Sequence, residues 1–381
     1  MTLHSPSTPS TVPIPGGGQL VLDDGVLEPF RLAPEEAGQQ LPRRCYAASH
    51  VAMQPGYRDV GHSIQSPGTS EEIAQWIDWD TSMAFRRRLD SLGFGIAEAM
   101  DTAQRFELGW AGARQLIEAT GELGLRNGFI GAASADHADG LENAADLAAA
   151  LAEQGRFVES CGGVPIILPQ PWLTASAADE ATYVRVYCDA IDAIEGPVLL
   201  HWLSEAFHPA MKGYFPGDSL RTILAHDRQK VRGMKISMLD RELEESLRAE
   251  LAEHGQVILT GDDYHFAGLI EGHSQESIAL PELDGRPLQG GAFSHALLGI
   301  LNAVAVPASL ALRHLGRGDV ETYRKLMGPC EALGKEIFIA AETVLVPMLP
   351  TVAHHAFEDS LCSYDEMFWA SKLHFSISQL S

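Results

Sequence analysis

Lys235 is the residue of this sequence best placed to do covalent chemistry. It lies inside the apolar run VRGMKISML, where its side chain is expected to be partly removed from water. Desolvation favours the neutral amine of a lysine, which can attack a carbonyl carbon and form a Schiff base. Ion-pair networks also hold buried lysines, so a structural lysine paired with a carboxylate such as Glu98 or Asp262 is the alternative interpretation.

Further polar residues recur where the apolar runs of the chain end. A core built for stability alone excludes unpaired charges, because burying one is costly. An imidazole changes its protonation state near neutral pH, so His201 is the residue expected to move protons beside Lys235. The residues expected to bind substrate are Glu98, Asp101, Asp136, His137, Gln170, Ser237 and Asp262.

The same oxygen and nitrogen side chains allow a second chemistry. Carboxylates and imidazoles bind divalent metal ions, which can polarise a carbonyl and support enolisation or retro-aldol cleavage. No compact motif such as H-E-x-x-H occurs in the sequence. In the leading interpretation no cofactor is expected. In this alternative the ligands of a divalent metal ion are Glu98, His137, His201 and Asp262, with Asp136 as a further candidate.

Short apolar runs alternate with segments of helical period along most of the chain. This alternation is typical of β-α units and a parallel sheet. Segments 142–154, with an apolar face, and 182–194 are expected to be helices. The expected strands are 45–51, 95–100, 128–133, 164–168, 198–203, 231–237, 257–260 and a short segment near 291–297.

Eight such units over about 260 residues predict a (β/α)₈ TIM barrel, in which active-site residues lie at the carboxyl ends of the strands. Residues 1–40, rich in Ser, Thr, Pro and Gly, are expected to form an extended or partly ordered leader. Residues 41–306 would form the barrel and residues 307–381 a helical extension packed on it. An open doubly wound sheet is the alternative, but no G-x-G-x-x-G motif follows the first strand.

The segment around Lys235 resembles a motif of a known enzyme superfamily. Residues 233–240, GMKISMLD, are similar to the G-I-K-[DE]-x-[ST]-G-D strand of the dihydrodipicolinate synthase and N-acetylneuraminate lyase superfamily, the class I aldolases whose lysine forms a Schiff base. Residues 257–263, VILTGDD, resemble its strand-7 segment ending in S-G-D-D, and residues 128–155 resemble its strand 3 and following helix. The resemblance covers roughly residues 44–341. It implies a barrel with extra C-terminal helices, a Schiff-base role for Lys235, and a homodimer or homotetramer.

The sequence departs from that superfamily at positions that would handle substrate. Members carry a Thr-Thr or Ser-Thr pair after strand 2, whereas this chain reads GIAEAMDTAQ, with Glu98 in place of a small hydroxyl donor. The tyrosine that members take from the end of strand 4 for proton relay is absent, because residues 168–172 read LPQPW. Tyr57 and Tyr264 lie in loops that could reach the mouth of the barrel, and their spacing selects neither. A divergent branch of the superfamily is therefore predicted.

Three functions follow from these residues. The leading prediction is a lyase or aldolase that acts on a small keto acid or keto-sugar derivative, with the imine on Lys235 as the electron sink when a neighbouring bond breaks. The second is the metal-dependent enolisation or retro-aldol enzyme, acting on a sugar derivative. The third is a non-catalytic sugar-binding or regulatory barrel that kept the fold.

The net charge of the chain argues against some classes of binding partner. The sequence holds 27 Lys and Arg against 51 Asp and Glu, for a net charge of −24. Nucleic acids and anionic membranes are bound by clustered basic residues, and no basic run is longer than 86–88, so neither is an expected partner. A small-molecule substrate is expected instead. The first residues lack a secretory signal pattern and the five cysteines form no C-x-x-C pair, which predicts a reduced, cytoplasmic location.

Overall fold

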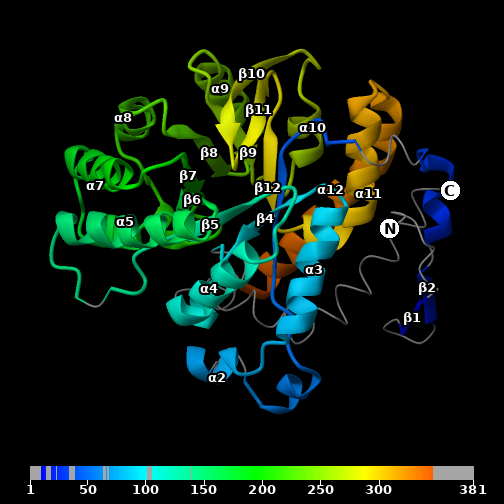
Figure 1. Ribbon diagram of the computed structural model, residues 1–381, viewed down its shortest axis with the longest axis horizontal. Coiled ribbons are helices and arrows are strands. Elements are labelled where there is room, and N and C mark those ends of the chain that lie inside the picture. Colours follow the sequence, from blue (N-terminus) through cyan, green and yellow to red (C-terminus); the bar gives the residue numbers. More distant parts are fainter. Residues whose placement is uncertain are drawn as a thin grey trace.

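The protein folds around a closed barrel of eight parallel strands, ordered β12-β3-β4-β5-β6-β7-β8-β9 (Figure 1). This computed structural model describes residues 10–13, 19–22, 24–33, 39–62, 66, 68–100, 105–138 and 140–345. The predicted (β/α)₈ barrel is confirmed, and every expected strand corresponds to one of the eight. The strands are β3 (Cys45–Ala48), β4 (Gly95–Glu98), β5 (Phe129–Ala133), β6 (Val164–Ile167), β7 (Val198–Leu203), β8 (Val231–Ser237), β9 (Val257–Thr260) and β12 (His295–Leu298).

Helices surround the barrel, and several begin at an acidic or amide side chain. Asp78, Asn143, Asp179 and Asp240 each accept a hydrogen bond from a backbone N–H of the first helical turn, which satisfies a donor that the helix leaves unpaired. Among the described residues no helix combines the length and apolar composition needed to cross a bilayer. The outer helices are α3 (Trp79–Ser91), α4 (Arg105–Gly121), α5 (Ala144–Ser160), α7 (Glu180–Ala193), α8 (Ser219–His226), α9 (Arg241–Ala252), α10 (Phe266–Glu271) and α11 (Leu301–Gly316).

Short elements occupy the loops and the amino-terminal leader. The connections that follow strands contain η2 (Pro55–Asp59), α2 (Ser70–Ala74), α6 (Pro171–Ala175) and η3 (Pro209–Met211). In the leader, β1 (Ser10–Pro13) pairs with β2 (Gln19–Leu22), and the 3₁₀ helix η1 (Asp24–Phe30) follows.

The C-terminal helices pack against the barrel's own last helix. α11 begins at Leu301 and continues through Pro307, so the helix of the eighth unit runs across the expected boundary at residue 306. α12 (Val320–Leu345) packs on α11, and the Tyr323 hydroxyl donates to the carbonyl of Ala267 on α10. The part of the expected extension beyond residue 345 lies outside the described residues.

Side chains alternate between the lumen of the barrel and the layer beneath the helices. Residues of the lumen pack together in one cluster that includes Tyr46, Ala97, Ile166 and Leu259. Residues at intervening positions, such as Ile96, join the clusters beneath the helices. This alternation decides which polar residues of a strand can meet a molecule inside the barrel.

Two strands, β3 and β4, end two or more residues earlier than the sequence predicts, each for a local reason. After β3, the carbonyls of Ser49 and His50 accept hydrogen bonds from the Arg86 guanidinium and not from a neighbouring strand. After β4, Ala99 adopts a φ of 53°, a conformation that interrupts the strand, and Met100 then points into the lumen.

A hairpin that the sequence analysis missed closes the amino-terminal end of the lumen. β10 (Ser277–Leu283) and β11 (Arg286–Gly291) pair antiparallel across a turn of Asp284 and Gly285, which both have positive φ. Leu283 and Leu288 enter the lumen cluster, and the Tyr46 hydroxyl donates to Asp284 at 2.5 Å. In Figure 1 the hairpin lies at the top of the view and α2 at the bottom, so the two mark opposite ends of the barrel.

Gly233 of β8 is required by the close approach of β9. Its φ is 143°, and a Cβ atom there would lie 1.9 Å from the carbonyl oxygen of Val257. We predict that Gly233→Ala lowers the free energy of unfolding by at least about 2 kcal/mol, because backbone atoms cannot yield as a flexible side chain does. Urea denaturation measures this. The control is Gly328→Ala on α12, where a Cβ meets nothing within 4 Å; equal stability of the two variants would contradict the prediction.

Candidate active site

Lys235 points into the lumen from β8, near the carboxyl end of the barrel. Only 4% of the residue is exposed. Its register partners are His201 on β7 and Leu259 on β9, and Leu259 belongs to the lumen cluster. The intervening residues Met234 and Ile236 pack beneath the helices, as strand alternation requires.

Gly261, directly after β9, leaves the space that the lysine occupies. A Cβ atom at this position would lie 2.6 Å from Cε of Lys235 and 2.2 Å from Oγ of Ser237. His201 is fully buried, and its Nε2 lies 3.4 Å from the same Ser237 hydroxyl. Lys235, Ser237 and His201 therefore form one polar group around a glycine, and this is the centre of the candidate site.

Gln170 and Ser134 form a second polar pair at the carboxyl end of the barrel. Both residues are largely buried, and the Gln170 amide Nε2 donates to Oγ of Ser134 at 3.5 Å and to the carbonyl of Leu168 at 2.8 Å. They stand at the ends of β6 and β5. Amide and hydroxyl groups here can bind a carbonyl or hydroxyl oxygen of a substrate.

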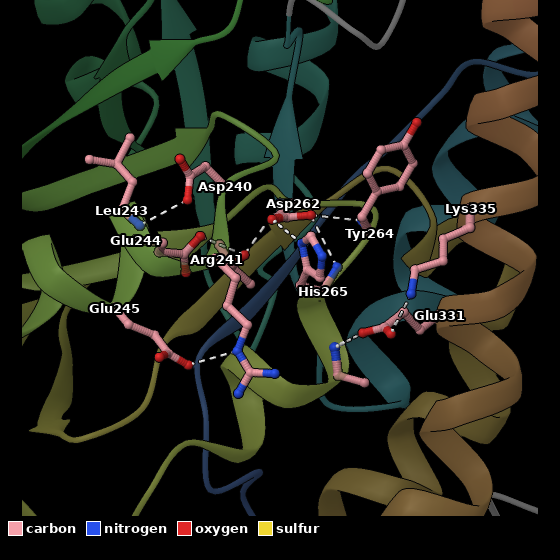
Figure 2. Close-up of polar contacts among 12 residues, drawn as sticks. Asp240, Arg241, Leu243, Glu244, Glu245, Asp262, Tyr264, His265, Glu331 and Lys335 are labelled. Atoms are coloured by element: carbon pink, nitrogen blue, oxygen red, sulfur yellow. Dashed lines mark hydrogen bonds and ion pairs between the residues drawn. The ribbon is translucent and has the colours of Figure 1, made fainter.

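Asp262 and Asp263 have different roles in the loop after β9. Asp262 folds back on its own turn: it accepts hydrogen bonds from the backbone N–H groups of Tyr264 and His265 and contacts His265 Nδ1 at 2.9 Å (Figure 2). Burial raises the pKa of Asp263 to about 7, against the opposing charge of Lys235, which lowers it. Asp263 is thus a carboxyl that interacts with the lysine electrostatically, and sequence reasoning missed it.

Glu244 of α9 supports the same loop from outside the lumen. Its carboxyl is buried and accepts hydrogen bonds from the hydroxyls of Ser294, at 2.7 Å, and Thr260, at 3.0 Å. Burial raises the pKa of Glu244 to about 8, although these two hydrogen bonds oppose the rise. Thr260 in turn accepts from the backbone N–H of Asp262, so the loop rests on this carboxyl.

Glu98 is not presented to a molecule in the barrel, contrary to the sequence expectation. It forms a fully buried, bidentate ion pair with Arg86 of α3, at 2.6 and 2.7 Å, and accepts from the Thr120 hydroxyl of α4 at 2.6 Å. The reason is strand alternation, because Ala97 occupies the lumen position and Glu98 turns toward the helices. Glu98 is therefore also not the structural partner of Lys235.

Asp136 and His137 also lie apart from the lysine. Arg105 binds both oxygens of Asp136, and the Gln154 amide Nε2 donates to Asp136 and contacts His137 Nδ1 at 2.8 Å. Burial acts to raise the pKa of Asp136, but the hydrogen bonds and charge of Arg105 outweigh it and hold that pKa below its ordinary value. The Gln154 carbonyl oxygen also accepts from the backbone N–H of Ser134, so this network supports the β5 end.

The remaining expected residues divide as follows. Asp101 lies outside the described residues. The structure does not bring together the four ligands of the metal alternative, and in the part of the chain that it describes no three His, Cys, Asp or Glu side chains form a metal-binding group. Of these four expected ligands, His201 lies in the lumen and Asp262 contacts His265 in its own turn. Glu98 and His137 take part in two separate hydrogen-bond networks.

Neither loop tyrosine stands at the position of the missing strand-4 tyrosine. Tyr57 contacts His62 at 3.2 Å, and the Tyr264 ring packs edge-on against Phe338 of α12. The hydroxyl that reaches the end of β6 belongs to Tyr214, which accepts from the backbone N–H of Gln170 at 2.7 Å. Burial holds the pKa of Tyr214 well above its ordinary range, so this phenol keeps its proton.

Comparison with solved structures defines the class of this barrel. Similar folds include dihydrodipicolinate synthase from Aquifex aeolicus, with 10% identity over 85% of this chain and 98% of that chain and a TM-score of 0.54. N-acetylneuraminate lyase from Fusobacterium nucleatum complexed with pyruvate has 12% identity over 85% of this chain and 97% of that chain, with a TM-score of 0.51. A variant of 2-keto-3-deoxygluconate aldolase from Sulfolobus solfataricus has 11% identity over 84% of this chain and 85% of that chain, with a TM-score of 0.52. These likenesses show the fold, and they confirm the resemblance that the sequence predicts.

The chain has the barrel fold seen in dihydrodipicolinate synthase and N-acetylneuraminate lyase, with extra C-terminal helices. The chain belongs to the family described as "Protein of unknown function (DUF993)", whose model matches residues 21–345. No curated protein matches the sequence.

The Glu98 ion pair predicts a loss of stability on substitution. Glu98→Gln leaves the fully buried Arg86 without its counter-charge, so we expect the free energy of unfolding to fall by about 3 to 5 kcal/mol in urea denaturation. Glu118→Gln is the matched control, because its pair with Arg114 is exposed and contributes at most about 1 kcal/mol. A Glu98 variant as stable as the control would show that the buried pair is not needed.

Glu244 predicts a pH dependence of stability. Its pKa is about 8 in the folded protein and near 4.5 in the unfolded chain, so between these values the native state holds the extra proton and stability falls as the pH rises. Glu244→Gln removes this contribution, and its unfolding free energy should fall less than that of the wild type between pH 5 and pH 8. Glu242→Gln, exposed on the same helix, should follow the wild type. Parallel pH profiles for wild type and Glu244→Gln would refute the assignment.

Proposed function

We propose that this protein is a lyase of the class I aldolase type, which forms a Schiff base between Lys235 and a small keto acid or keto-sugar derivative. The observation that carries the proposal is the position of Lys235: it is buried in the lumen, at the end of the barrel where active sites of this fold lie. Burying a lysine there costs free energy, because its ammonium group is removed from water, and a role in catalysis accounts for its presence.

The fold comparison supports the reaction class. The similar structures carry the names of lyases and aldolases, and the N-acetylneuraminate lyase structure was determined with pyruvate, a 2-oxo acid. We extend this class to the present chain because its lysine lies on the barrel strand whose sequence resembles theirs.

The chemistry proceeds through covalent intermediates on Lys235. Nζ of Lys235, as the neutral amine, attacks the carbonyl carbon of the substrate, and the oxygen of the resulting carbinolamine leaves as water after protonation. When the bond between the α-carbon and the hydroxyl-bearing β-carbon breaks, its electron pair moves toward the protonated imine and gives an enamine, while the departing fragment loses the proton of that hydroxyl and becomes an aldehyde. The enamine takes a proton on carbon, and water hydrolyses the imine to release the ketone and the lysine.

His201 and Asp263 are the groups proposed to move protons in these steps. His201 stands beside Lys235 in the register of β7 and β8 and contacts the Ser237 hydroxyl. The pKa of Asp263, raised by burial to about 7, leaves this carboxyl able both to give and to take a proton near neutral pH. The imine itself accepts the electron pair, so the proposal includes no metal or organic cofactor.

Neutral hydrogen-bonding groups, more than carboxylates, would hold the substrate. Glu98 and Asp136 are bound by arginines outside the lumen, so Ser134, Gln170 and Ser237 are the neutral groups proposed to bind the substrate. Hydroxyl and amide groups both donate and accept hydrogen bonds, which suits the hydroxyls of a sugar-derived chain. A dimer or tetramer is part of this proposal and is measurable by analytical ultracentrifugation.

Borohydride trapping tests the proposal. The protein is incubated with a panel of 2-oxo acids, keto-sugars and sugar-derived 2-oxo acids, reduced, and mapped by mass spectrometry. We expect one reduced adduct on Lys235, no adduct in Lys235→Met, and an unchanged adduct in Lys212→Met, whose side chain is exposed. Turnover by the same variants should fall by at least about 10³-fold for Lys235→Met only.

Other outcomes would replace the proposal with a different function. Turnover that persists in Lys235→Met, or that disappears on chelation without any adduct, would favour the metal-dependent reaction. Ligand binding with no turnover of any compound in the panel would favour the non-catalytic barrel.

A further inference from the structure

A cavity of about 280 Å³ lies at the end of the barrel opposite Lys235. The residues before β3, the start of β12, strand β11 and the end of α11 form its walls. It contains none of the residues assigned to the candidate active site, so a role for this cavity does not depend on the proposed function. Its lining includes Gln40, Arg44, Gln289, His295, Arg313 and Arg317.

Basic residues and no acids line this cavity, within the part of the chain that the structure describes. Such a lining is unexpected in a protein with a net charge of −24. Arg43 also borders the cavity, but its guanidinium stacks on Phe293 at 3.4 Å and donates to the carbonyl of Ile270. The other positive charges of the lining belong to Arg44, Arg313 and Arg317.

Arg44 and Arg313 are buried beside neutral acceptors. Each is 8% exposed; Arg44 donates to the Pro287 carbonyl at 2.6 Å, and Arg313 donates to the carbonyls of Gln39, at 2.5 Å, and Leu92, at 3.2 Å. Among the described residues, neither has a carboxylate within ion-pair distance. Burial lowers the pKa of both guanidinium groups, because removal from water disfavours their charged form more than nearby negative charges favour it.

Among the described residues, the groups near Arg44 do not cancel its charge. Asp284 acts on Arg44 from a distance, but Arg286 and the Tyr46 hydroxyl already bind its carboxylate. His295 adds no charge, because burial lowers its pKa to about 3. Its Nδ1 accepts from the backbone N–H of Arg44, and Nε2 contacts the Gln289 carbonyl.

We infer that this cavity binds a small oxyanion: the phosphate or carboxylate group of a metabolite. A guanidinium presents paired N–H donors that match two oxygens of either group, and Arg44 and Arg313 are held in place by their carbonyl contacts. The Gln40 and Gln289 side chains can add amide hydrogen bonds. The volume suits a small molecule at the lower end of the range of ligand sites.

Calorimetric titration at fixed ionic strength tests the site, with inorganic phosphate and citrate as separate probes. We expect saturable binding to the wild type, at least about tenfold weaker binding to Arg44→Gln and Arg313→Gln, and unchanged binding to Lys235→Met, which excludes the active site. Arg221→Gln is the control of equal charge change, because Arg221 pairs with Glu250 on the surface outside the cavity. Its affinity should stay within about twofold of the wild type.

Each result has a defined meaning. Binding of phosphate only indicates a phosphate ester, binding of citrate only indicates a carboxylate, and binding of both supports an oxyanion site of either kind. Failure of both probes to bind the wild type, or equal binding to Arg44→Gln and the Arg221 variant, would overturn the inference. Circular dichroism checks folding; if Arg44→Gln and Arg313→Gln unfold, Arg317→Gln, an exposed residue at the rim, replaces them and should bind at least about threefold more weakly.

Discussion

The contact between β8 and β9 is the constraint on which the candidate site depends. Two glycines permit it: Gly233 lets the backbone of β9 come close, and Gly261 leaves room for Lys235 and Ser237 inside the lumen. A side chain at either position would separate the strands or displace the lysine. The local motif therefore encodes both the chemistry and the space in which it takes place, and the rest of the barrel holds these two strands in register.

Buried charges in this protein are divided between two regions. The fully buried pair of Glu98 with Arg86 joins β4 to α3, and the partly buried pair of Asp136 with Arg105 joins the loop after β5 to α4. In the lumen, by contrast, the charged groups proposed to act are Lys235 and Asp263. This division leaves Asp263, whose pKa burial raises to about 7, beside Lys235, while Glu98 and Asp136 are held by arginines.

The architecture could be predicted from the sequence because it depends on patterns that repeat. Eight apolar runs separated by helical segments specify the barrel, and the segment around Lys235 specified the strand that carries the lysine. The hairpin was missed because Pro281, Pro287 and two glycines make its strands resemble a loop; the Asp284-Gly285 pair was the available signal.

The composition of the site was harder to predict, since strand alternation and turn geometry decide it. Since side chains alternate along a strand, placing Ala97 in the lumen would have predicted that Glu98 faces the helices. Whether Asp262 or Asp263 interacts with Lys235, however, depends on which of the two carboxylates accepts hydrogen bonds from the backbone N–H groups of the turn. Two adjacent aspartates in a sequence do not indicate which one does so.

The hairpin also has a consequence for the order of events in the lumen. Leu283 and Leu288 fill the amino-terminal end, so a molecule that reaches Lys235 enters from the carboxyl end and leaves the same way. In the proposed reaction, the fragment bound to the lysine would be deeper than the fragment cut from it. The detached fragment would then depart first, and in the reverse direction the fragment that joins the lysine would arrive first. The closed end of the barrel would thus impose an ordered sequence of binding and release on the proposed reaction.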